Sequence, residues 1–139
     1  MVYWIKILHE RNTYVVDLDS LSAFCIGINQ RIQFWLPESG QPIIINLTSN
    51  PDVYHQIVEY IKKTTTQPLS KCWVTIGYQR HRYVIDLNQV RTFTCDCSQR
   101  ITFWLPHTQE SIILNPQNNP EDYQKVQEYI YRTTGFSLP

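Results

Sequence analysis

An eight-residue phrase occurs twice in this chain of 139 residues. QRIQFWLP occupies residues 30–37 and QRITFWLP occupies residues 99–106, a shift of 69 positions from 30 to 99. Shifting the whole chain by the same distance aligns its two halves without a gap, and about 27 positions then carry the same residue, as expected of an internal repeat. The sequence therefore predicts two similar units, residues 1–66 and 70–139, packed as one globular body.

Each half carries the same order of strand and helix signals. In the first half, β-rich runs separated by polar or turn-forming residues lie at 4–8, 14–18, 23–28, 32–36 and 43–46. A helix signal follows, in which Asn50 suits the N-cap and Pro51 the first helical position. Its apolar stripe is Tyr54, Ile57, Val58 and Ile61, which the second half repeats with Tyr123, Val126 and Ile130.

These signals predict an α+β fold built by tandem duplication of an antiparallel β-β-β-β-β-α unit. We expect two small sheets, each covered by one helix and related by a pseudo-two-fold axis. Residues 64–71 form a short polar segment with one proline, which is too short to separate the two units widely.

Strand alternation divides the side chains of each unit between two faces. In RIQFWL, the residues Ile32, Phe34 and Leu36 should face the helix, and Trp35 should face away. The same alternation places all four tryptophans, Trp4, Trp35, Trp73 and Trp104, on the face opposite the helices. Because contiguous apolar patches are rare on monomers, this face should be covered. The other unit, a second copy of the chain, or a ligand or partner could each cover it.

Arg31 and Arg100 follow a hairpin turn in each half, close to Trp35 and Trp104. An arginine beside a tryptophan can stack a base or bind a phosphate, and both residue types are common anchors in protein interfaces. The alternative is a structural contact, either with the indole or with Asp17 and Asp86 across the sheet. The candidate binding residues are therefore Trp4, Arg31, Trp35, Trp73, Arg100 and Trp104.

Composition restricts the classes of partner. Twelve basic residues balance twelve acidic ones, so the strong positive charge typical of phosphate-backbone binders is missing. The first residues, MVYWIKILHERN, do not have the pattern of a signal peptide, and no apolar run is long enough to span a membrane. We therefore expect a cytoplasmic protein with reduced cysteines and no membrane partner.

Other candidate chemistry has simpler structural explanations. Cys95 and Cys97 align with Ile26 and Ile28, which favours buried core thiols; a zinc site would need Cys72 together with His81 or His107, and the spacing does not support it. Asp17 and Asp86 should stabilise tight turns. There is no phosphate-binding glycine motif and no nucleophile–base arrangement. We expect no enzymatic activity, cofactor, metal or small-molecule substrate.

The repeated layout resembles that of the Whirly and PUR-type single-stranded nucleic-acid binders, which duplicate a sheet-plus-helix unit. QRIQFWLP and QRITFWLP, together with Trp4 and Trp73, carry the resemblance. It implies binding of single-stranded DNA or RNA by the aromatic and basic residues of the sheet face. The chain differs from those families in its fifth strand per unit and in its balanced charge. The main expectation is a small interaction module that binds another protein or itself, and nucleic-acid binding is the alternative.

Overall fold

The computed structural model describes residues 3–66 and 72–138, which form an α+β fold with antiparallel sheets. In the first half the elements are β1 Trp4–His9, β2 Asn12–Asp17, the 3-10 turn η1 Leu18–Ser20, β3 Ala23–Ile26, β4 Arg31–Trp35, β5 Pro42–Asn46 and α1 Pro51–Thr66. In the second half they are β6 Trp73–Tyr78, β7 His81–Asp86, η2 Leu87–Gln89, β8 Phe93–Cys95, β9 Ile101–Trp104, β10 Ser111–Leu114 and α2 Pro120–Thr134. Both halves thus contain the expected order of elements. Residues 67–71 of the expected linker lie outside the described part.

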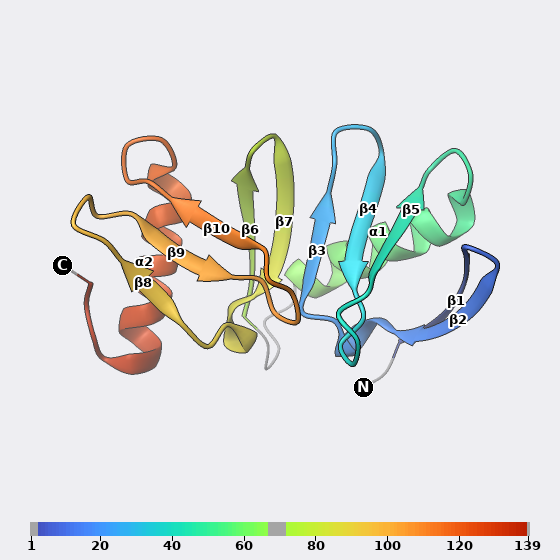
Figure 1. The fold of residues 1–139 in the computed structure, drawn as a ribbon, viewed down its shortest axis with the longest axis horizontal. Coiled ribbons are helices and arrows are strands. Elements are labelled where there is room, and N and C mark those ends of the chain that lie inside the picture. The colour runs from blue at the N-terminus through green and yellow to red at the C-terminus, as the bar shows by residue number, and fades with distance from the viewer. Residues whose placement is uncertain (1–2, 67–71, 139) are drawn as a thin grey trace.

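The strands form three antiparallel sheets rather than the expected two. A central sheet has the order β5-β4-β3-β7-β6, a three-stranded sheet has the order β10-β9-β8, and β1 pairs with β2 in a separate hairpin. Figure 1 shows the hairpin β1–β2 at one end of the long axis and β8 and β9 at the other. The central sheet contains strands from both halves, so the two halves do not form separate sheets.

Strand β3 of the first half joins strand β7 of the second half. Ala23 lies opposite Ile85, Phe24 opposite Val84, Cys25 opposite Tyr83 and Ile26 opposite Arg82. The backbone N–H of Asp86 extends the pairing by donating to the carbonyl of Ser22 at 2.9 Å. The positional counterpart of β3 is β8, and that of β7 is β2. A two-fold axis relating the halves would also require β8 to pair with β2, and these two strands are not paired in the described structure.

Each helix packs an apolar face on strands, but in α1 two residues of the predicted stripe, Tyr54 and Val58, are only half-buried. Helix α1 buries Val53, Ile57, Tyr60 and Ile61, and α2 buries Tyr123, Val126, Tyr129 and Ile130. The prolines at 51 and 120 begin the helices, where a missing N–H is tolerated. Gly135 ends α2 in a left-handed conformation, with its N–H donating to the carbonyl of Tyr131. Neither helix is long and apolar enough to cross a membrane, among the residues described.

The two halves repeat several contacts at matching positions. The hydroxyl of Tyr60 donates to Asp19 at 2.5 Å, and that of Tyr129 donates to Asn88 at 2.6 Å. Likewise, the Asn50 side chain donates to the carbonyl of Leu8, and Asn119 donates to that of Gly77, each at 3.4 Å. The tyrosine bonds fasten each helix to the 3-10 turn of its own half, and the asparagine bonds fasten the residue before each helix to the first hairpin.

The two hydrophobic cores interlock across the junction of the halves. The core of the second half includes Ala23, Cys25 and Trp35 of the first half. The core of the first half includes Val84, with Trp73 packed against it. The ring centroids of Trp73 and Phe24 lie 5.9 Å apart. Each half therefore completes the core of the other, and we call these five residues, Ala23, Cys25, Trp35, Trp73 and Val84, the inner junction.

Several expectations for single residues need correction. Ile28 and Cys97, expected in the core, are both exposed, because each lies in the turn after a short third strand of its half. Leu18, expected at the end of a strand, instead begins η1. The prediction for Asp17 and Asp86 is confirmed, since each carboxylate caps the 3-10 turn that follows it.

Candidate protein-interaction surfaces

The four tryptophans occupy different environments, although matching sequence surrounds them. Trp35, at the end of β4, is only 6% exposed, whereas its counterpart Trp104, at the end of β9, is 41% exposed. Trp4, at the start of β1, is 60% exposed, whereas its counterpart Trp73 is half-buried against Phe24. In each half, the face opposite its own helix is thus covered by the other half in the middle of the molecule and open at the end of the molecule.

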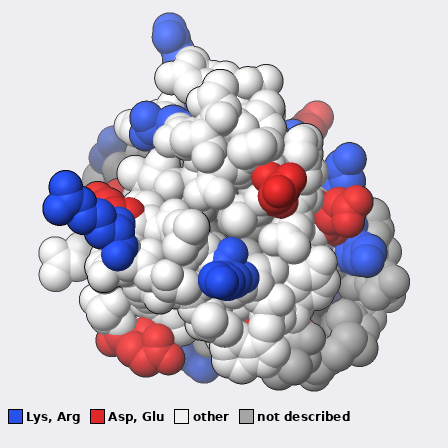
Figure 2. Space-filling view, turned by 90° about the vertical axis from the view of Figure 1, so that its right-hand side faces the viewer, with Lys and Arg blue, Asp and Glu red and all other residues white. Residues whose placement is uncertain are grey.

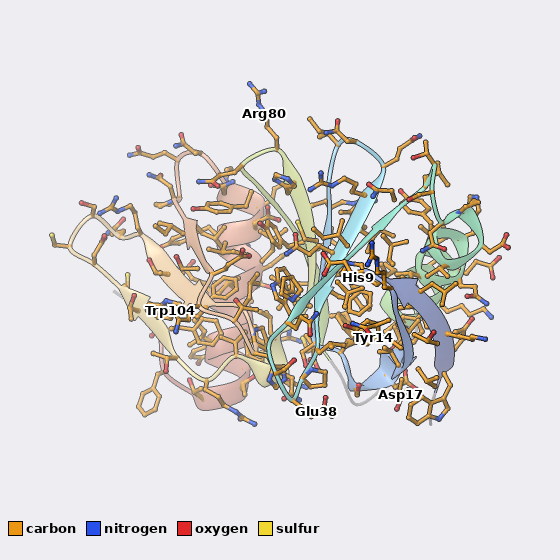
Figure 3. The ribbon with its side chains drawn as sticks, turned by 45° about the vertical axis from the view of Figure 1, so that its right-hand side comes forward. His9, Tyr14, Asp17, Glu38, Arg80 and Trp104 are labelled. Carbon is orange, nitrogen blue, oxygen red and sulfur yellow. The ribbon has the colours of Figure 1, made fainter. Side chains whose placement is uncertain are left out.

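The first open end lies along β2, the outer strand of the β1–β2 hairpin. Val15 is 65% exposed here, although its counterpart Val84 is 3% exposed at the inner junction. A hollow of about 390 Å³ runs beside β2, and Trp4, Val15, Val16 and Leu36 supply its apolar lining. We call this surface, with Tyr14 and Asp17 at its border, the β2 end. Figure 3 shows Tyr14, Asp17 and Glu38 on this side of the molecule.

Charged side chains are sparse at the β2 end. Figure 2 looks at the side of the molecule on which β1 and β2 lie, and it shows one basic and one acidic group in the middle of a mainly uncharged surface, with further charged groups toward the outline. Exposed Trp4 and Val15 lie beside Lys6, which is opposite Val15 in the β1–β2 pairing, and beside Asp17 and Glu38 of the hollow. Exposed apolar side chains with a polar and charged border are typical of protein interfaces.

The second open end lies along β8, whose only pairing partner in the described structure is β9. Its exposed residues are Thr92, Thr94 and Trp104, the counterparts of the buried residues Ala23, Cys25 and Trp35. A shallow hollow of about 350 Å³ adjoins Trp104 and is lined by Thr92, Leu105 and His107 among others. We call Thr92, Thr94 and Trp104 the β8 end. Figure 3 shows Trp104 on the side opposite Tyr14.

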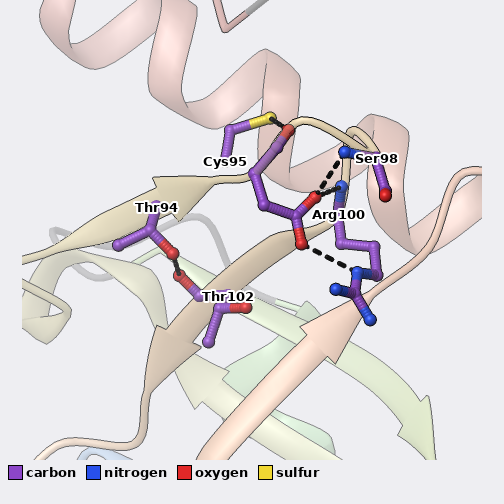
Figure 4. A network of polar contacts seen from close by, with 6 residues as sticks. Thr94, Cys95, Ser98, Arg100 and Thr102 are labelled. Carbon is purple, nitrogen blue, oxygen red and sulfur yellow. Dashed lines mark hydrogen bonds and ion pairs between the residues drawn. The ribbon is translucent and has the colours of Figure 1, made fainter.

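Arg31 and Arg100 do not contact Asp17 or Asp86, the partners considered from the sequence. Arg100 Nε instead lies 2.8 Å from Asp96 Oδ2, in an exposed ion pair within the β8–β9 turn. Figure 4 shows that the Asp96 carboxylate also accepts the backbone N–H groups of Ser98 and Arg100. These hydrogen bonds lower the pKa of Asp96. The bond from the Arg100 backbone has the largest effect, and the bond from the Arg100 side chain lowers the pKa further. Arg100 is thus used to hold the turn.

Arg31 is exposed and lines a small hollow of about 110 Å³ with Gly27, Asn29, Gln33 and His81. This hollow lies between the turn after β3 and the start of β7. Since Trp35 is buried in the core of the second half, Arg31 and Trp35 do not form one accessible stacking surface. The six candidate residues therefore do not come together: two tryptophans belong to the inner junction, and one lies at each open end.

The cysteines are all free thiols. Cys25 lies opposite Tyr83 in the β3–β7 pairing, and burial raises the pKa of its thiol. Burial also raises the pKa of Cys72. Within residues 3–66 and 72–138, no group of three or more His, Cys, Asp or Glu side chains is placed to hold a metal ion.

The β2 end and the β8 end were not predicted from the sequence. Strand alternation shows on which face of a sheet a side chain lies, but not whether that part of the face is covered by the rest of the molecule. The repeat contained a usable signal. Positions at which one half has Ala23 or Cys25 and the other has Thr92 or Thr94 mark a difference in burial. Comparison of the chain with protein-family models, with curated proteins and with solved structures found no match.

Proposed function

We propose that the chain is a tandem of two equivalent units and acts as a non-enzymatic interaction and assembly module, which binds protein through the β2 end and the β8 end. One observation carries this proposal: Val15 and Trp104 are exposed, while their counterparts Val84 and Trp35 are buried at the inner junction. The chain thus contains, in its own middle, an example of how these surfaces are covered.

The chemistry of the ends supports protein as the partner. Strand edges such as β2 and β8 offer unpaired backbone donors and acceptors, which an added strand can satisfy. Apolar side chains beside such an edge supply specificity and burial. A cytoplasmic location belongs to the same proposal, and the four free thiols support it, because disulfides are rare in reducing compartments.

Binding of single-stranded nucleic acid receives less support. The aromatic and basic residues on which it depends are divided, since Trp35 is buried and Arg100 holds Asp96. Tryptophan fluorescence titrated with oligonucleotides at low and moderate salt checks this alternative. Salt-sensitive quenching would favour it over protein binding.

Differential capture from the extract of the source cells tests the main proposal. Val15→Lys and Thr94→Lys place a charge on the β2 end and on the β8 end, respectively. Gln56→Lys and Gln124→Lys are matched controls, because Gln56 and Gln124 are exposed on the helices α1 and α2, outside both ends. We expect a protein identified by mass spectrometry that the native chain and both controls retain, and that at least one end variant loses. Equal capture by all five proteins would contradict the proposal.

A further inference from the structure

We infer that the partner of these surfaces is a second copy of the chain, with β8 of one copy pairing antiparallel with β2 of the next. The inference rests on the proposed function and identifies its partner. It follows from the pairing of β3 with β7, because β8 is the positional counterpart of β3 and β2 is that of β7.

The register of the new pair can be written from the inner one. Ala23 opposite Ile85 becomes Thr92 opposite Val16, and the next positions place Phe93 opposite Val15, Thr94 opposite Tyr14 and Cys95 opposite Thr13. The bond from the Asp86 N–H to the Ser22 carbonyl becomes one from Asp17 to Arg91. None of the eight paired positions carries a charge, so no like charges oppose the contact.

Side-chain burial follows the same transfer. At the inner junction, Trp35 lies in one core cluster with Ile85 and Leu105. The counterparts of Ile85 and Leu105 are Val16 and Leu36, and both line the hollow of about 390 Å³ at the β2 end. The counterpart of Trp35 is the exposed Trp104. The hollow, within the range of volumes that hold a drug-sized ligand, is therefore the seat of Trp104 from the neighbouring copy.

Both sides of the contact are exposed in the single chain and lie far apart. The β1–β2 hairpin and the β8–β9 pair occupy opposite ends of the long axis (Figure 1). The β8 strand of a chain therefore cannot pair with the β2 strand of the same chain, and each copy has one open β2 end and one open β8 end. Contacts of this heterologous type continue into a ring or an open filament.

The hairpin turns differ between the halves and stand outside the proposed pairing. Gly40 has a φ of 72°, and a Cβ there would lie 2.7 Å from the carbonyl oxygen of His107. Its counterpart is Gln109, and in the second half the positive φ falls on His107 instead. The contact between copies thus repeats the strands and the indole, but not the turn.

Complementation between blocked ends is the decisive experiment. Sedimentation velocity of the purified native chain should show association that increases with concentration. Val15→Lys and Thr94→Lys should each weaken it by more than about tenfold, because each removes contact at one end, whereas the helix variants Gln56→Lys and Gln124→Lys should associate like the native chain. An equimolar mixture of the two blocked variants retains one good end of each kind, so it should form dimers that grow no further.

Three results would overturn the inference: a native chain that stays monomeric at every concentration, a blocked variant that associates alone as the native chain does, or a mixture that stays monomeric while the native chain associates. None of these contradicts the proposed function, which depends on end-dependent capture from extract. Conversely, association of the pure chain with unchanged capture by all variants would leave self-association as the only role of the ends.

A thiol cross-link checks the register independently of any blocking charge. Thr13→Cys in a Cys97→Ser background places a thiol opposite Cys95 of the next copy. Mild oxidation should give disulfide-linked dimers and longer species, and the further change Cys95→Ser should abolish them. Cross-linking that survives Cys95→Ser would join position 13 to another thiol, either position 13 of a second copy or Cys72, and would contradict the head-to-tail register.

Discussion

Asp17 and Asp86 illustrate how one residue performs the same task in two surroundings. The Asp17 carboxylate accepts the N–H groups of Tyr3 and Asp19 at 2.8 and 3.0 Å. The Asp86 carboxylate accepts those of Cys72 and Asn88 at 3.0 and 3.1 Å. Each therefore ties the start of the first hairpin of its half to the turn after the second strand. The difference lies in water access, because Asp86 is buried and Asp17 is half-buried.

Replacing the two aspartates tests the importance of that difference. We expect Asp86→Ala to lower the free energy of unfolding by about 3 kcal/mol, since the backbone donors of Cys72 and Asn88 lose their buried carboxylate acceptor. Asp17→Ala should cost clearly less, because water can reach the donors that it leaves. Urea unfolding of both variants at neutral pH measures the two losses. Equal losses would contradict the assignment of water access as the cause.

At the scale of elements, the strands and helices could largely be predicted from the sequence. Alternation located the strands, and the Asn-Pro pairs located the starts of both helices, because these signals act through neighbours in the chain. A tight turn at Asp17 and at Asp86 was predicted, but its 3-10 form and its start at Leu18 and Leu87 were not, since these leucines continue the apolar pattern of the preceding strand. The pairing of β3 with β7 was not predictable either. Alternation is the same whichever strand lies alongside.

The same limit applies to the candidate site. Trp35 and Trp104 occupy identical phrases, and only their position relative to the other half makes one buried and the other exposed. Local patterns do not contain that information. The tryptophans were therefore identified as important, but their division between an inner junction and two ends required the topology.

Val84 and Val15 give the sharpest test at this scale, because they are the same residue at matching positions of β7 and β2. Val84→Ala should lower the free energy of unfolding by about 1–3 kcal/mol, since it removes buried methyl groups from the core of the first half. Val15→Ala should change it by less than about 0.5 kcal/mol in the monomer. Urea unfolding at a concentration that keeps the chain monomeric makes the comparison. A loss for Val15→Ala as large as that for Val84→Ala would show that β2 is already covered.

For the whole molecule, the interlocked cores make the two halves one stability unit. Ala23, Cys25 and Trp35 complete the core of the second half, and Val84 completes that of the first. The tyrosines add a shared dependence on pH. Burial is the main cause that raises the pKa of Tyr60, Tyr83, Tyr123 and Tyr129, and it also raises that of Cys25.

Stability should therefore be constant at neutral pH and fall in alkali. A group whose pKa is higher in the folded state than in the unfolded chain stabilises the fold below its unfolded pKa, and this contribution is lost as the pH rises further. The ordinary values are 9.0 for the thiol and 10.0 for the phenols, so the decline should begin near these values. Urea midpoints between about pH 7 and 11 measure it. Tyr60→Phe should make the loss of stability with rising pH shallower. An unchanged pH dependence in that variant would show that Tyr60 does not contribute to this loss.

The offset pairing of β3 with β7 has a consequence for protein engineering. The second strand of one unit pairs with the third strand of the unit before it. A third unit fused to the C-terminal side could therefore use the same pairing, and no new interface would have to be designed. Of the tryptophans in a row of three or four units, only the counterpart of Trp4 in the first unit and that of Trp104 in the last unit would stay exposed. The length of such a rod would then be set by the number of coding segments.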